Sequence, residues 1–80
     1  MEAITDYIRA NWEYPSGADP MTILDIEVLD IEALNALNST ADYIDIAQSG
    51  DILIADHEGG QAEIVRIEGG QIRQIWNNCY

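Results

Sequence analysis

The sequence predicts an α+β domain, in which an antiparallel sheet with a C-terminal three-stranded meander packs against one or two short helices. The tetrapeptide Glu-Gly-Gly-Gln occurs twice, at 58–61 and 68–71, between segments rich in Ile and Val. Each Gly-Gly pair can take the positive φ of both central positions of a type I′ turn, which predicts two successive hairpins. In addition, 48% of the 80 residues are hydrophobic, enough for a core despite the high charge. We therefore expect residues 1–80 to form a single compact acidic domain.

The two turns also predict the register of the meander. Antiparallel partners step in opposite directions along their strands, so Ile54 should lie opposite Val65, and Ile67 opposite Ile72. The strands are expected at 52–56, 62–67 and 72–76.

Strand alternation assigns the meander's side chains to two faces. The core face is expected to carry Ile52, Ile54, Val65, Ile67, Ile72 and Trp76. The second face carries Leu53, Ala55, Ile64 and Ile75, together with Arg66 and Arg73. Because a large apolar face invites association, we expect the N-terminal segment or another subunit to cover this second face.

The same register creates two like-charge pairs. Arg66 faces Arg73, and Asp56 faces Glu63, an arrangement that is unfavourable by ~0.2–1 kcal/mol per pair. We therefore expect the two arginines to bind carboxylates outside their own pair.

The N-terminal segment from Met1 to Trp12 predicts an amphipathic helix, because Ile4, Ile8 and Trp12 recur at helical spacing. The helix must end before Tyr14, since the residue preceding a proline is disfavoured in the α region. Trp12 and Tyr14 could form an aromatic recognition site, but their spacing favours the edge of the core.

Residues 22–38 fit a strand followed by a helix better than one helix. Hydrophobic and acidic residues alternate over 24–28, which indicates a half-buried strand, and Asp30 can then cap a helix over 30–38. We expect this helix and the N-terminal helix to cover one face of the sheet. Tyr43 to Ala47 is expected to form another short strand. A capped helical turn within 39–48 is the alternative.

Charge is the extreme feature of the composition. Fifteen acidic residues stand against three arginines and no lysine, for a net charge of −12. The stretch from Glu13 to Glu58 holds eleven of the acids and no positive residue. Such a surface repels nucleic acid and anionic membranes and attracts basic proteins. We expect a basic protein partner, no direct nucleic-acid binding and no membrane association, although acidity that serves solubility alone would give the same composition.

No catalytic, metal or cofactor motif is present. Asp25, Glu27, Asp30 and Glu32 lack the spacing of a calcium loop. His57, beside the first Gly-Gly turn, has no second histidine or nucleophile with which to form a triad. The lone Cys79 is expected to be an inert or incidentally oxidisable thiol. We therefore expect a protein that is not an enzyme and has no cofactor. No segment predicts a membrane span or a signal peptide, which favours a cytoplasmic protein.

In its size, its acidity, its absence of lysine and its lack of catalytic residues, the chain resembles the small phage-encoded anti-CRISPR proteins. The resemblance covers the whole chain in character and no particular motif. Several of those families block a Cas effector complex by occupying its DNA path. The resemblance therefore implies an inhibitor that acts in the host cell cytoplasm and mimics DNA charge. The alternative is an acidic structural or assembly module that acts as a homodimer.

For an inhibitor of this kind, the partner should contact the acids of the segment that lacks positive residues. A carboxylate surface there can approach the charge density of a nucleic-acid backbone. The candidate contact residues are Asp19, Asp25, Glu27, Asp30, Glu32, Asp42 and Asp45.

Overall fold

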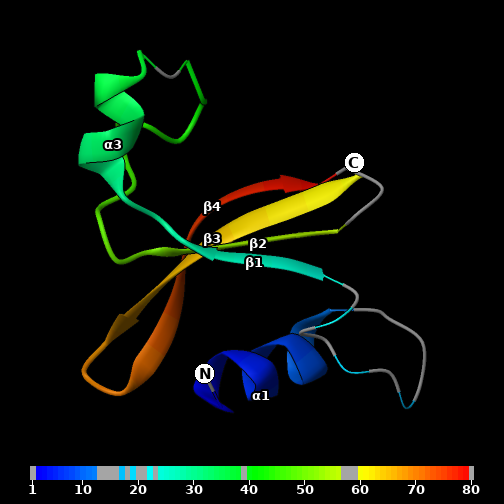
Figure 1. The fold of residues 1–80 in the computed structure, drawn as a ribbon. Helices are drawn as coiled ribbons and strands as arrows, with labels where there is room; N and C mark the ends of the chain where they lie inside the picture. Colours follow the sequence, from blue (N-terminus) through cyan, green and yellow to red (C-terminus); the bar gives the residue numbers. More distant parts are fainter. Residues whose placement is uncertain are drawn as a thin grey trace.

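Four antiparallel strands form one sheet whose spatial order, β1-β2-β3-β4, follows the order of the chain (Figure 1). The computed structural model describes residues 2–12, 17, 19, 22, 24–38, 40–56 and 60–79. The predicted α+β class and C-terminal meander are confirmed, and the 24–28 strand joins the meander at its edge. The elements are α1 (Glu2–Asn11), β1 (Leu24–Val28), α3 (Ile31–Ala36), β2 (Ile52–Asp56), β3 (Gln61–Glu68) and β4 (Gln71–Cys79).

Helix α1 covers one face of the sheet. Its apolar residues recur every four positions and so share one side of the helix. Ile4, Ile8 and Trp12 are accordingly buried, and they join one hydrophobic cluster with Leu24, Ile52, Ile54 and Val65. Trp12 is only 7% exposed, which confirms its place in the core, while Tyr14 lies outside the described residues.

The segment between β1 and β2 covers the opposite face. Leu29 and Ala47 are buried around Ile64, and Leu34 and Tyr43 pack against them. The expectation that both helices cover the same face was wrong, and residues of the segment between β1 and β2, not the N-terminal segment, pack on the second face. Two backbone hydrogen bonds explain the difference, because Leu29 N donates to Asp51 O at 2.8 Å and Gly50 N donates to Leu29 O at 2.9 Å. They close the base of the 29–51 segment beside the sheet, and α3 lies within that segment.

Residues 42–46 form a helical turn, so the predicted strand at 43–47 was wrong and the alternative is the one observed. Ala47 N donates to Tyr43 O at 2.9 Å, and Ile44 N donates to Ala41 O at 3.1 Å. These local bonds satisfy backbone groups that would otherwise need a neighbouring strand. Helix α3 is shorter than the predicted 30–38 helix, because Leu37 is its C-cap and Asn38 has a φ of 55°.

The register between β2 and β3 differs from the prediction by two residues. Val65 lies opposite Ile52, not Ile54, and Glu63 lies opposite Ile54, not Asp56. β2 ends at Asp56 and β3 begins at Gln61, and Gly60 does not have the positive φ that a two-residue type I′ turn requires. Because this shift is even, the side chains of β2 and β3 keep their predicted faces.

The second hairpin has the predicted turn, with φ of 56° at Gly69 and 79° at Gly70. The pairs Ile67–Ile72 and Arg66–Arg73 are confirmed. Beyond them, a bulge between Ile64 and Val65 places Trp76 opposite Ile64, where Ile75 was expected. An extra residue in one strand reverses the facing of the residues that follow it. Trp76 therefore packs on the α3 side of the sheet, with its ring centroid 5.3 Å from that of Tyr43.

Candidate partner-binding surface

Two of the candidate acids project from the edge strand β1. Asp25 pairs with Ala55 and Glu27 pairs with Leu53. Directly opposite residues point to the same side of a sheet. Both carboxylates therefore lie on the face where Leu53 packs against the cluster of Leu29, Ala47 and Ile64. Both side chains are exposed.

Four more candidate acids lie on the segment that covers this same face. Asp30 caps α3, with its Oδ1 accepting a 3.1 Å hydrogen bond from Ala33 N, and Glu32 is in the first turn of the helix. Asp42 and Asp45 belong to the helical turn whose Tyr43 packs into the cluster. All four are exposed. Together with the two acids of β1 they make up the acidic surface, which consists of Asp25, Glu27, Asp30, Glu32, Asp42 and Asp45.

Asp19 is the candidate acid that the fold separates from the others. Its carbonyl oxygen accepts a 2.9 Å hydrogen bond from Thr22 N, in the connection that precedes β1. Helix α3 follows the other end of the same strand (Figure 1). Asp19 is exposed, but it lies beyond the end of β1 that is farther from α3 and is not part of the acidic surface.

Arg66 binds Asp51, and the geometry is bidentate. Its Nε donates to Asp51 Oδ1 at 2.8 Å and its terminal amino group donates to Oδ2 at 2.9 Å. Oδ2 also accepts a 2.8 Å bond from Gln48 N. Asp51 is only 3% exposed. The hydrogen bond from Arg66 outweighs desolvation and holds the pKa of the Asp51 carboxyl below its ordinary value. The same hydrogen bond raises the pKa of Arg66.

Arg73 binds Glu68 at the exposed end of the second hairpin. Its terminal amino group lies 2.6 Å from Glu68 Oε1, and the two side chains are 62% and 53% exposed. The expectation that each arginine finds a carboxylate outside the Arg66–Arg73 pair is confirmed. Both carboxylates lie outside the acidic surface.

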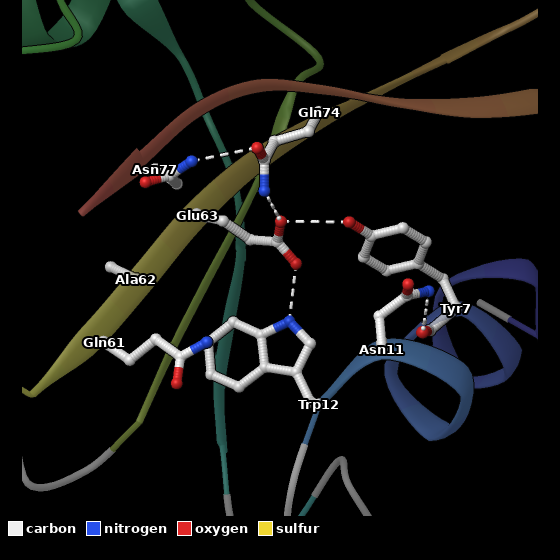
Figure 2. A pocket seen from close by; sticks show the side chains of 8 residues that line it. All are labelled: Tyr7, Asn11, Trp12, Gln61, Ala62, Glu63, Gln74 and Asn77. Carbon is white, nitrogen blue, oxygen red and sulfur yellow. Dashed lines mark hydrogen bonds between the residues drawn. The ribbon is translucent and has the colours of Figure 1, made fainter. Parts of the chain in front are cut away.

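Glu63 is an inward-facing acid that the sequence reasoning did not select. It is 5% exposed, and its carboxylate accepts three hydrogen bonds from neutral side chains (Figure 2). Trp12 Nε1 donates to Oε1 at 2.5 Å, while Tyr7 Oη and Gln74 Nε2 donate to Oε2 at 2.9 and 2.5 Å. The sequence did contain a signal for this burial. Glu63 is two positions from Val65 and four from Ile67, so strand alternation places it on the predicted core face with them.

The Glu63 network links α1 to the middle of the sheet and borders a cleft of about 280 Å³. Burial, followed by the hydrogen bond to Glu63 and its negative charge, raises the pKa of Tyr7 to about 12. The phenol therefore remains a hydrogen-bond donor at neutral pH. The cleft is lined by Tyr7, Asn11, Trp12, Gln61, Ala62, Glu63, Gln74 and Asn77.

The remaining candidate groups are the possible metal ligands and His57. Within the described ranges, His, Cys, Asp and Glu side chains nowhere form a group of three or more that could hold a metal ion. His57 lies outside the described residues. Of the helices in the described part of the chain, none is both long and apolar enough to cross a membrane.

Protein-family models, curated proteins and solved structures were each compared with the chain, and none of them matches it. Function is therefore inferred from the charges and geometry of the molecule itself.

Proposed function

We propose that this protein is an inhibitor that binds a basic, nucleic-acid-binding surface of another protein through its acidic surface. The observation that carries the proposal is that all six acids of this surface are exposed on the α3 side of the sheet. The two arginines that project from that side are bound instead to Asp51 and Glu68. A basic partner would therefore meet carboxylates that these arginines do not neutralise.

The overall charge supports mimicry of a nucleic-acid strand. The longest dimension of the molecule is 39 Å. Over that length, one DNA strand with a phosphate about every 3.4 Å carries roughly 11 charges, close to the net charge of −12 of the protein. A protein with this charge density can compete with a strand for a channel lined by Lys and Arg, and long-range attraction would speed its association.

In this role the protein acts in the cytoplasm as a binding protein without catalytic activity, and a Cas effector complex is the first partner to test. A homodimer is not needed to cover the second sheet face, because Leu29, Tyr43 and Ala47 of the same chain pack on it.

The test measures association with immobilised Cas effector complexes of type I and type II, with target DNA as competitor. We expect the association rate to fall steeply from about 0.1 M to 1 M salt, over which the Debye length shrinks from about 10 to 3 Å. DNA should exclude the protein from the complex. Binding that is insensitive to salt, or that coexists with bound DNA, would rule out charge mimicry.

Two double variants with equal charge change locate the surface. Asp25→Asn with Glu27→Gln removes two charges from the acidic surface, and Asp6→Asn with Asp19→Asn removes two exposed charges that lie outside it. Each changes the net charge from −12 to −10. The first pair should slow association and weaken affinity more than the second. Equal effects would mean that only net charge matters.

A further inference from the structure

We propose that the cleft between α1 and strands β3 and β4 is a binding site for an alkylguanidinium group, with the Glu63 carboxylate as its counter-ion. This site lies on the α1 face of the sheet, whereas the acidic surface lies on the α3 face. The inference therefore does not rest on the proposed inhibitory function.

Glu63 is a buried acid whose hydrogen-bond donors, among the described residues, are all neutral side chains. Glu63 lies opposite Ile54 on the α1 face. The sheet arginines bind Asp51 and Glu68, and alternation along β3 directs Arg66 to the opposite face from Glu63. Within the described part of the chain, the Glu63 carboxylate is stabilised by a phenol, an indole and an amide. A buried negative charge of this kind favours a cation that enters the cleft beside it.

The hydrogen-bonding capacity of the cleft selects a ligand that only donates. The described donors occupy three of about four acceptor positions of the carboxylate, with a single donor on Oε1. Asn11 Nδ2 donates to Tyr7 O, and Asn77 Nδ2 donates to Gln74 Oε1. These bonds leave the side-chain oxygens of Asn11 and Asn77, two of the residues that line the cleft, available as acceptors. A guanidinium group has five N–H donors and no acceptor.

The aromatic lining distinguishes guanidinium from ammonium. The rings of Tyr7 and Trp12 lie on two sides of the Glu63 carboxylate (Figure 2). A planar, weakly hydrated guanidinium can stack on an aromatic ring while it donates in its own plane, whereas a compact ammonium is strongly hydrated. A cleft of about 280 Å³ is large enough for this group with a short alkyl stem.

The experiment titrates the protein with n-butylguanidinium, n-butylammonium and n-butylurea, the last being a neutral analogue of the first. Amide-correlation NMR reads the indole N–H of Trp12 and the side-chain amides of Gln74 and Asn77. We expect saturable shifts with n-butylguanidinium, weaker binding of n-butylammonium, and binding of n-butylurea that is weaker by roughly ten-fold or more, the ratio expected for loss of a charge-assisted hydrogen bond. Either of two results with the wild-type protein would overturn the proposal. One is equal binding of n-butylurea and n-butylguanidinium, and the other is the lack of a saturable shift with n-butylguanidinium.

Variants then test the counter-ion. Glu63→Gln keeps the size of the side chain and removes its charge, so it should weaken n-butylguanidinium binding by roughly ten-fold or more. Asp6→Asn makes the same charge change at an exposed position on α1 outside the cleft and should leave binding unchanged. If Glu63→Gln does not fold, Asn77→Ala serves in its place, because Asn77 is exposed and supplies one of the acceptors. Equal affinities in wild type and in a folded cleft variant would refute the assignment.

A guanidinium can come from a free metabolite or from an arginine side chain of a protein. Free L-arginine is therefore compared with a blocked Ala-Arg-Ala peptide. Preference for the peptide would support the site and assign it to a protein partner, and preference for the free amino acid would support it as a small-molecule site. Failure of both to bind would contradict the proposal.

Discussion

Replacing Glu63 by alanine should weaken the attachment of α1 to the sheet more than removing the hydroxyl of Tyr7, one of its three hydrogen-bond donors. The change removes the acceptor of three hydrogen bonds at once. The Trp12 donor is buried, and a buried donor without an acceptor costs about 1–3 kcal/mol. The Tyr7 and Gln74 donors are only partly buried and can turn to water, so each loses a net ~0.5–1.5 kcal/mol.

Removing the carboxylate also relieves its own desolvation, which offsets part of this loss. We therefore expect Glu63→Ala to lower the free energy of unfolding by roughly 2–4 kcal/mol, out of about 4–12 kcal/mol for a domain of this length. Tyr7→Phe removes one donor and should cost only ~0.5–1.5 kcal/mol. Glu63→Gln keeps one acceptor oxygen and should fall between the two.

The measurement is urea unfolding at neutral pH, followed both by tryptophan fluorescence and by far-ultraviolet circular dichroism. Fluorescence reports on both tryptophans, Trp12 in the α1 cluster and Trp76 on the opposite face of the sheet, and dichroism reports on the helices and the sheet. A Glu63→Ala variant that loses less stability than Tyr7→Phe would refute the reasoning. It would mean that the three donors find other acceptors and that the carboxylate does not hold α1 in place.

Three further predictions concern the turns and the titrating groups. Gly70→Ala should destabilise the protein by ~1–2 kcal/mol because Gly70 has a φ of 79°. Gly60→Ala, in the other copy of the tetrapeptide, should be neutral or stabilising by up to ~1 kcal/mol. Equal losses of stability in urea unfolding would contradict this difference. The pKa of Asp51 in the folded protein lies below its ordinary value of 3.8, so the ion pair with Arg66 adds stability above about pH 3.8 that is lost as the pH falls. The difference in unfolding free energy between wild type and Asp51→Asn should therefore shrink at acidic pH. A difference that stays constant would count against the ion pair. The raised pKa of Tyr7 contributes stability below pH 10 that is lost as pH rises towards 12; ultraviolet titration should show a tyrosine component near pH 12 that Tyr7→Phe abolishes.

The local elements could be predicted because their signals lie within a few residues. Ile4, Ile8 and Trp12 share one side of a helix through spacing alone, and Asp30 caps α3 through a bond to Ala33, three positions later. The exposed acids could likewise be predicted, since charged side chains in short alternating or helical segments point to solvent. The second Gly-Gly turn could also be predicted from the local sequence, because glycine readily adopts the positive φ angles that both of its positions require.

Long-range pairing was decided only in three dimensions. The first Gly-Gly pair has the same local sequence as the second, yet β2 and β3 pair two residues out of the predicted register, and a bulge turns Trp76 to the other face. Glu63 meets Tyr7 across 56 positions of chain, and Arg66 meets Asp51 across 15. The composition determined that the protein is acidic. Among the described residues, the tertiary structure decided that Asp51 and Glu63 are buried as structural partners and that the acids of the acidic surface lie exposed on the same side of the sheet, because burial depends on contacts between residues far apart in the chain.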